Sequence, residues 1–426
     1  MPEIQPFRGY RYNLTRVSIV DVVAPPYDVI SQTQQSQLYS RSPFNVVRLI
    51  LGREEDRYSS AAKHFLEWQD KAILVRDQQS SIYVLHQTFE NKDGSQVTRK
   101  GFIALCKLEE FDKRVVLPHE KTLAKPREDR FQLLKATNTN FSQVFSLYSD
   151  PDKRMDSLLA EITKTIPEME VLFEDVQNKL WKCSDKQAIE GISEFLLDKQ
   201  VLIADGHHRY ETALVYREFM RSRNQKHSGK EPYNYTMMFF TNLDDEGLVI
   251  FPTHRIVHSL PSFDPQNFFE RVREYFIIRD FKEPHALLAA LASSSTRAFG
   301  VLVQGNPLFY LLTLRPTISA AEVLREALPQ EVKDLDVSIL HSLILRDVLG
   351  ISTEAQEQKT NLDYVRSVED CLRTVWDGAG QLAFLMNATQ IAEVRRAAKA
   401  GFMMPQKSTY FYPKLLTGLV INKLAD

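Results

Sequence analysis

Five consecutive residues, Asp205-Gly206-His207-His208-Arg209, bring a carboxylate, two imidazoles and a guanidinium to one turn of the chain. The apolar run Val201–Ala204 before them is typical of a buried strand, and apolar residues recur at helical spacing over His208–Arg221. Glycine permits a tight turn, and the first N–H groups of a helix lack intrahelical partners and carry the positive end of its dipole. The pattern therefore predicts a strand-to-helix turn that binds an anion such as phosphate.

The two adjacent histidines of this turn point in different directions, because neighbouring helical residues are rotated by about 100°. They cannot form the one-sided pair of a helical zinc site. One imidazole can instead bond a phosphate or a ligand hydroxyl while the other supports Asp205. The alternative without a ligand is that Asp205 caps the helix and the histidines fill a polar rim.

Short β-branched or aromatic runs alternate with longer amphipathic stretches along the chain. Strands are predicted at Asn45–Leu51, Ser81–Glu90, Lys100–Glu110, Phe141–Tyr148, Val201–Ala204, Tyr235–Thr241 and Gly300–Leu314. Helices are predicted at Asp56–Val75, Pro126–Ala136, Asp152–Thr165, Asp185–Leu197, His208–Arg221, Pro265–Tyr275, Ser319–Leu328, Val337–Leu349 and Gln390–Ala400. The interleaving predicts an α/β or α+β fold in which helices flank a mixed sheet.

Two polar segments, Arg223–Pro232 and Thr353–Thr360, are predicted to be loops on composition. The first of them suggests a boundary near residue 230, with domains at 1–230 and 231–426. A long surface loop inside one domain explains the same composition. A chain of 426 residues suits two to three domains or one elaborated domain.

Composition excludes several classes of protein. The chain has 53 basic and 55 acidic residues, so nothing indicates a nucleic-acid or anionic-membrane partner. Its three cysteines, Cys106, Cys183 and Cys371, lie far apart, which suits a reducing compartment rather than disulfides or a cysteine-rich zinc site. No signal peptide and no apolar run near the ~20 residues of a membrane span are apparent. We expect a cytoplasmic protein whose oligomeric state is open.

Three further segments carry candidate substrate-binding residues. Tyr27 and Asp28 follow a rigid double proline, and Arg48 lies inside an apolar run where it needs a carboxylate or an anionic ligand as partner. His254 and Arg255 follow the strand-like run at 248–251. A capped turn or a surface ion pair explains each one equally well. Together they predict a polar pocket assembled from distant segments.

Lys407, Ser408 and Thr409 place a cation and two hydroxyls before the aromatic stretch Tyr410–Tyr412. They do not form a P-loop, because Met404-Pro405-Gln406 stands where the glycine-rich part belongs. They could close over a phosphate or a substrate carboxylate. The alternative is a final buried strand with ordinary surface lysines.

The DGHHR turn resembles the signature of the ParB/sulfiredoxin-like superfamily, especially its free-serine kinases, and Leu117-Pro118-His119-Glu120 matches a second motif of those kinases. The resemblance implies that Glu120 activates the acceptor hydroxyl, with His119 beside it. It also implies that Gly206, His207 and Arg209 bind nucleotide phosphate. The LPHE and DGHHR motifs lie about twice as far apart in this chain as in the compact kinases. The resemblance therefore implies a superfamily core with large insertions, one near 150–199, and a C-terminal extension.

The whole chain resembles a bacterial and archaeal family known mainly as a domain of unknown function. The shared segments are Ala24–Ile30, the LPHE and DGHHR motifs, Pro252–Arg255 and Met404–Lys414.

These observations predict a nucleotide-dependent kinase that phosphorylates a small molecule, a free amino acid such as serine. Its cofactors would be ATP or ADP and Mg²⁺. Glu120 would be the general base, and His207, His208 and Arg209 would bind the phosphates. Asp205 would organise the turn or hold Mg²⁺. The alternative is a nucleotide-binding regulatory or DNA-associated ParB-like protein without kinase turnover. Sulfiredoxin-type repair ranks last, because it needs a cysteine where this chain has His207.

Overall fold

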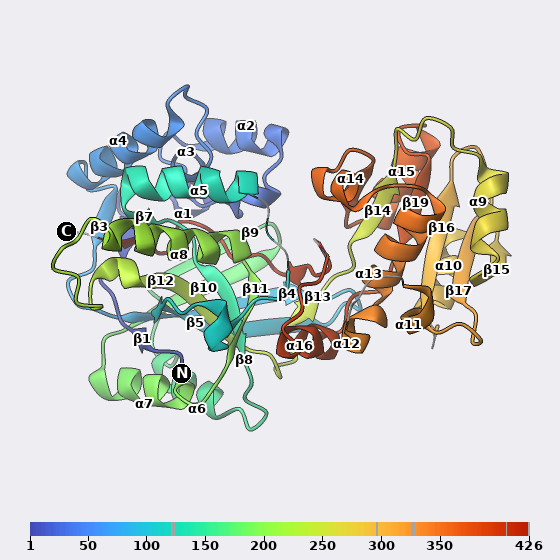
Figure 1. Ribbon diagram of the computed structural model, residues 1–426. Coiled ribbons are helices and arrows are strands. Elements are labelled where there is room, and N and C mark those ends of the chain that lie inside the picture. Colours follow the sequence, from blue (N-terminus) through green and yellow to red (C-terminus); the bar gives the residue numbers. More distant parts are fainter. Residues whose placement is uncertain (121, 123, 295–296, 325–328, 406, 425–426) are drawn as a thin grey trace. The chain divides into compact units, whose positions relative to one another are not determined.

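The computed structural model describes residues 1–120, 122, 124–294, 297–324, 329–405 and 407–424. Contacts between Cα atoms divide the chain into two compact units (Figure 1). The first unit contains Met1–Pro118, Thr122–Val249 and Pro413–Asp426, and the second contains His119–Lys121 and Ile250–Tyr412. The main break therefore falls after Val249 instead of near residue 230. The reason is that strand β12 (Tyr235–Asn242) pairs inside the large sheet of the first unit.

The first unit is built on a nine-stranded mixed sheet. Its order is β6 (Val116–Leu117), β11 (Val201–Asp205), β8 (Val144–Tyr148), β12, β5 (Gln96–Lys107), β4 (Ile82–Glu90), β10 (Val176–Cys183) and β9 (Met169–Phe173), with β1 (Ile4–Gln5) paired to β5. The pairs β6–β11 and β8–β12 are parallel, and the other pairs are antiparallel. All eight residues of the central strand β12 are buried, as expected for a strand covered on both faces.

Helices cover both faces of this sheet. Figure 1 shows α4 (Arg57–Asp70), α5 (Ala124–Thr137) and α8 (His207–Arg221) on one side, and α6 (Arg154–Ile162) and α7 (Lys186–Leu196) on the other. The shorter elements of the unit are α1 (Ile19–Val22), η1 (Tyr27–Val29), α2 (Gln32–Arg41), α3 (Val47–Ile50), η2 (Phe111–Lys113), η3 (Pro232–Asn234) and the strand pairs β2 (Tyr10–Tyr12) with β3 (Leu74–Arg76) and β7 (Thr139–Asn140) with β21 (Asn422–Lys423). The predicted α/β architecture with a mixed sheet is confirmed.

The second unit contains a six-stranded antiparallel sheet. Its order is β15 (Phe276–Phe281), β17 (Phe309–Leu314), β16 (Ala298–Val303), β19 (Leu382–Leu385), β14 (His254–Val257) and β18 (Leu362–Val365). Its helices are α9 (Pro265–Val272), α10 (Pro284–Ala292), α11 (Ala320–Val323), α12 (Gln330–Lys333), α13 (Asp336–Ile339), the π-helix η4 (Leu340–Val348), α14 (Thr353–Gln358), α15 (Val368–Trp376) and α16 (Ile391–Lys399). The two-residue strand β13 (Val249–Ile250) spans the break between the units, and β20 (Phe411–Tyr412) ends the second unit.

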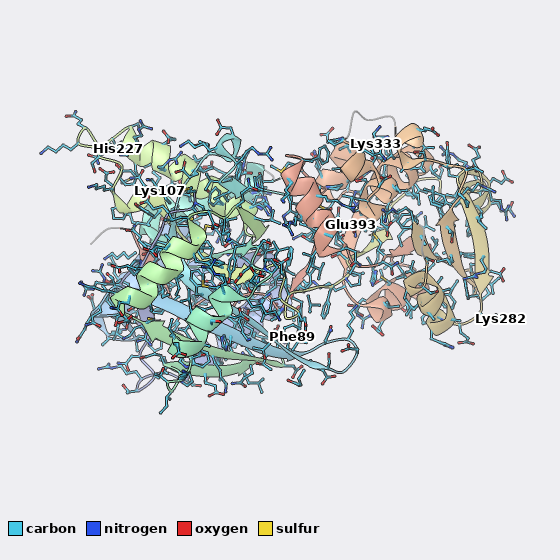
Figure 2. All side chains as sticks on the ribbon, turned by 90° about the horizontal axis from the view of Figure 1, so that it is seen from below. Phe89, Lys107, His227, Lys282, Lys333 and Glu393 are labelled. Atoms are coloured by element: carbon cyan, nitrogen blue, oxygen red, sulfur yellow. The ribbon has the colours of Figure 1, made fainter. Side chains whose placement is uncertain are left out.

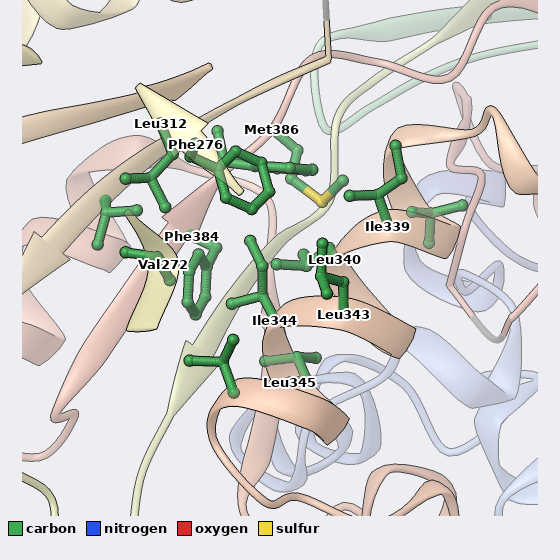
Figure 3. Packing of buried hydrophobic residues seen from close by; sticks show 14 of the residues in the cluster. Val272, Phe276, Leu312, Ile339, Leu340, Leu343, Ile344, Leu345, Phe384 and Met386 are labelled. Carbon is green, nitrogen blue, oxygen red and sulfur yellow. The ribbon is translucent and has the colours of Figure 1, made fainter. Parts of the chain in front are cut away.

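Alternating side chains give this sheet two apolar cores. Leu312 and Phe384 join the core that Leu343 and Ile344 of η4 complete, which Figure 3 shows at close range. Their neighbours point the other way, so Leu385 belongs to the core formed with α10 and α15. Successive side chains of a strand point to opposite faces of the sheet, so each strand packs against helices on both faces.

Three local predictions are wrong for identifiable reasons. Asn45–Leu51 is not a strand but contains helix α3, and the Asn45 side chain accepts the Val47 N–H at 2.9 Å in the turn before that helix. Thr353–Thr360 is not a loop, because Ser352 caps helix α14 at its start. The predicted strand Gly300–Leu314 is the hairpin β16–β17, which turns at Gly305 with φ +73°.

The other predicted helices and strands are found with shifted ends. Of the predicted helix Ser319–Leu328, only Ala320–Val323 is helical, Leu324 is extended, and 325–328 lie outside the described residues. The stretch 150–199 forms α6, the β9–β10 hairpin and α7, and so widens the large sheet at one edge. The segment Arg223–Pro232 is a loop up to the start of η3, as predicted.

Charged side chains lie over the surface of each unit, as Figure 2 shows for Lys107 on the first and Lys282 on the second. The three cysteines are buried and free. Among the described residues, no helix is long and apolar enough to cross a membrane.

Candidate phosphate-binding site

The DGHHR turn joins β11 to α8, as the sequence predicts. Four residues of β11 are buried and the fifth is Asp205, so the strand delivers a carboxylate to the edge of the sheet. Gly206 follows with φ +91°, a conformation that side chains with a Cβ rarely adopt. Its carbonyl then accepts the N–H groups of Arg209 and Tyr210, which closes the first turn of α8. His207 is buried and His208 half-buried in that turn.

Arg209 is fixed against the start of its own helix. Its Nη2 donates to Asp205 Oδ2 at 2.8 Å, and its Nη1 donates to the carbonyl of Gln143. A Cβ on Gly206 would lie 2.8 Å from the guanidinium carbon, so the missing side chain makes room for the cation. The turn therefore holds a positive charge at a helix N-terminus. The guanidinium charge and the helix dipole both favour an anion at this position.

Asp205 organises this turn through both of its carboxylate oxygens. Oδ2 accepts from Arg209, and Oδ1 forms an ion pair with Lys414 Nζ at 2.6 Å. Two cations on one carboxylate do not suit a Mg²⁺ ligand, and no group of three or more metal-ligating side chains occurs in the part of the chain that the structure describes. In this arrangement Asp205 holds Arg209 and Lys414 together at the turn.

A small cavity of about 60 Å³ lies beside Arg209 in the first unit. Tyr27 and Arg130 line it together with Arg209, and hydroxyls come from three threonines and one serine, Thr139, Thr212, Thr236 and Ser142. The Arg130 guanidinium lies 3.9 Å from the centre of the Tyr27 ring, and burial raises the pKa of Tyr27 to about 12. Tyr27 is therefore a neutral phenol beside two guanidinium groups, and the cavity can hold a few waters or one small oxyanion.

Arg130 is itself held in place. Its Nε donates to Asp129 Oδ2 at 2.8 Å and its Nη1 donates to the carbonyl of Ile50 at 2.9 Å. Burial alone would raise the pKa of Asp129, but Arg130, Tyr58 and Arg57 lower it overall. Asp129 is thus ionised and keeps Arg130 over Tyr27.

A second polar cluster lies inside the second unit and contains His119 and Glu120 of the LPHE motif. Glu120 Oε1 accepts the Lys407 N–H at 3.1 Å, and His119 Nε2 lies 3.0 Å from Thr409 Oγ1. The backbone joins the same segments, because the Met404 N–H donates to the His119 carbonyl at 2.7 Å. His119 and Glu120 are thus joined to Met404, Lys407 and Thr409, although 287 residues separate Glu120 from Lys407 in the sequence.

Arg255 completes this second cluster from β14. Its Nη2 donates to the Lys407 carbonyl at 3.2 Å, so the Lys407 peptide bridges Arg255 and Glu120. Only 2 % of Arg255 is exposed, and burial lowers its pKa to about 10, while the charges of Tyr364 and Glu120 oppose that shift. His254 Nδ1 accepts the Met386 N–H at 3.1 Å.

The family model described as a protein of unknown function (DUF1015) matches residues 4–338, which is more than half of the chain. The chain belongs to this family. No curated protein matches this DUF1015 member.

Among solved structures, the DUF1015 protein is similar to a conserved hypothetical protein from Pyrococcus furiosus, at 15% identity and a TM-score of 0.35, over 73% of this chain and 92% of that one. It is also similar to a free serine kinase in complex with AMP, at 15% identity and a TM-score of 0.34, over 70% and 83% of the two chains. A third is SbnI with a C-terminal truncation from Staphylococcus aureus, at 9% identity and a TM-score of 0.33, over 74% and 85%.

The predicted site residues of the DUF1015 protein thus fall into two groups. Tyr27 lines the same cavity as Arg209 in the first unit. His119, Glu120, His254, Arg255, Lys407, Ser408 and Thr409 belong to the second unit. Asp28 and Arg48 are not among the residues that line the cavity, and Arg48 instead donates to the Tyr39 carbonyl at 3.0 Å and stacks on the Tyr39 ring.

Two residues of these clusters were not predicted. Arg130 is only 8 % exposed and lies in a helix where Leu133 and Leu134 are also buried. Its one signal in the sequence is its position three and four residues before these leucines, on the apolar side of a predicted helix. His341 lies in η4 among apolar residues and accepts the Arg255 Nε–H at 3.3 Å. Nothing in its sequence context distinguishes it from a core histidine.

Proposed function

We propose that this DUF1015 protein is a nucleotide-dependent kinase that phosphorylates a small molecule, a free amino acid such as serine. The observation that supports the proposal is the geometry of the DGHHR turn. Gly206 leaves space for the Arg209 guanidinium, Asp205 orients it, and the helix N-terminus adds its dipole. Phosphoryl transfer depends mainly on positioning and charge neutralisation, which this set of groups is suited to supply.

In the proposed reaction, Gly206, His207, His208 and Arg209 bind the phosphates of ATP or ADP. Glu120 accepts the proton of the acceptor hydroxyl as a bond forms between that oxygen and the terminal phosphorus. The bond from phosphorus to the bridging oxygen breaks, and the nucleotide leaves one phosphate shorter.

One observation supports the assignment of the base to Glu120. Its carboxylate accepts the Lys407 N–H at 3.1 Å, so it has a defined orientation.

The test is phosphoserine formation from serine with ATP or ADP, followed by ³¹P NMR. Wild type is expected to turn over, Glu120→Gln and His208→Ala are expected to lose most of the rate, and Glu190→Gln, a change at an exposed position of α7, is expected to retain it. Undiminished turnover by both site variants contradicts the assigned roles. Nucleotide binding by wild type without acceptor-dependent turnover favours the regulatory or DNA-associated alternative.

A further inference from the structure

A pocket of about 860 Å³ opens in the first unit, among residues of α4, α5 and α8 and Tyr27. This volume lies within the range of roughly 300–1,000 Å³ that is usual for small-molecule sites. Aromatic rings of Tyr27, Tyr58 and Phe131 line it, together with three cationic and two acidic side chains. The combination of aromatic faces with excess positive charge suits a ligand that has a planar part and an anionic part.

The pocket shares a wall with the small cavity beside Arg209. Tyr27 and Thr212 line both spaces. On α8, Arg209 lines the small cavity, Thr212 lines both, and Val215 lines the large pocket. These positions are spaced i, i+3 and i+6, so they form one stripe along the helix, about 9 Å in length at 1.5 Å rise per residue.

The charges at the border between the two spaces are fixed by one carboxylate. Asp129 accepts from Arg130, which lines the small cavity, and forms an ion pair with Arg57, which lines the large pocket, at 2.5 Å. The Tyr58 hydroxyl also donates to Asp129 at 2.9 Å. One acid therefore orients two guanidinium groups and one phenol, and the net charge of this cluster stays positive.

We propose that the large pocket receives the nucleoside part of the nucleotide whose phosphates lie at the DGHHR turn. This inference rests on the proposed function and adds the location of the base and ribose. A ligand anchored by phosphate at Arg209 and extended along α8 reaches Thr212, whose hydroxyl donates to the Arg127 carbonyl at 3.3 Å and can accept a hydrogen bond from the ribose. It then reaches Val215 and the aromatic faces, which suit the base.

The test uses the full chain and two probes, ADP and inorganic pyrophosphate, by isothermal titration calorimetry. Val215→Trp fills the pocket from a position that is 52% exposed, so the fold should tolerate it. Val75→Trp is the matched control, because Val75 is 38% exposed on β3 and lines neither space. Val215→Phe replaces the tryptophan variant if thermal unfolding shows that the latter is not folded.

We expect wild type and Val75→Trp to bind both probes. Val215→Trp should bind ADP at least about tenfold more weakly and pyrophosphate within about twofold of wild type. Unchanged ADP affinity in folded Val215→Trp overturns the inference, and so does an equal loss of both probes, because the block would not be confined to the nucleoside. Failure of wild type to bind either probe overturns the proposed function instead.

Discussion

Lys414 forms an ion pair with Asp205 at 2.6 Å, although 209 residues separate the two in the sequence. The last segment of the chain therefore returns to the first unit and helps to set the DGHHR turn. The other oxygen of the Asp205 carboxylate forms an ion pair with Arg209, so one carboxylate at this turn holds two cationic side chains. A strand end, a helix start and the C-terminal segment are joined at this point.

Replacing the central acid should destabilise the protein. Asp205→Asn leaves two largely buried cations, each with an exposed fraction of 13% or less, without their carboxylate. We expect the free energy of unfolding to fall by about 1–3 kcal/mol, as measured by urea denaturation. Asp198→Asn removes an acid that is 75% exposed and should change that free energy by less than about 0.5 kcal/mol. Equal effects of the two changes would show that Asp205 does not organise the turn.

The space above Gly206 can be tested with a matched pair of glycines. Gly206 and Gly94 both have positive φ, +91° and +80°, so alanine at either position should cost about 1 kcal/mol of folding free energy through the backbone. A Cβ at Gly94 meets nothing within 4 Å, whereas at Gly206 it meets the Arg209 guanidinium. We expect both variants to lose stability in thermal melts, and only Gly206→Ala to bind pyrophosphate more weakly. Normal binding by that variant would contradict the role of the glycine.

The buried imidazole of His341 predicts a pH dependence of stability. The pKa of His341 is lowered to about 3, mainly by burial and also by the Arg255 charge, while the hydrogen bond to Gln356 opposes the shift. Its Nε2 accepts from Arg255, while its Nδ1 lies 2.8 Å from Gln356 Oε1, so a second proton would face the guanidinium. The folded protein keeps His341 neutral, whereas the unfolded chain protonates it near pH 6.5.

Stability from this residue is therefore complete above pH 6.5 and is lost as the pH falls toward 3, with a slope of at most about 1.4 kcal/mol per pH unit. We expect chemical denaturation from pH 7 to pH 4 to show a smaller loss of stability in His341→Gln than in wild type. His285→Gln, a change of an exposed histidine, should follow wild type. Parallel curves for all three proteins would contradict this assignment.

The sequence pattern predicted a helix or strand correctly where the residues within that segment alone determine its structure. The strand Val201–Ala204 and the helix that follows are found within one residue, because an apolar run, a glycine and helical spacing all agree there. Asn45–Leu51 shows the opposite case. Its apolar residues read as a strand, but the Asn45 side chain makes its hydrogen bonds to Val47 and to the Asp21 carbonyl, and so favours a short helix.

The site was predicted only in part, because its parts are joined by long-range contacts. Tyr27 and Arg209 were chosen as separate motifs, and the structure places both on one cavity. Arg130, which connects them, follows no motif and gains its position from Asp129 and the Ile50 carbonyl. The bridge from Arg255 through Lys407 to Glu120 likewise depends on backbone atoms, which no residue type reveals.

The most direct test of the anion site compares two arginines of α8. Arg209 and Arg217 are both 13% exposed, but only Arg209 lies in the first turn, while Arg217 pairs with Glu110 and the Leu108 carbonyl. Pyrophosphate binding should be measured by isothermal titration calorimetry for wild type, Arg209→Met and Arg217→Met. The proposed site predicts a loss of affinity of at least about tenfold for Arg209→Met and a change within about twofold for Arg217→Met. Equal pyrophosphate affinity in Arg209→Met and wild type would contradict it.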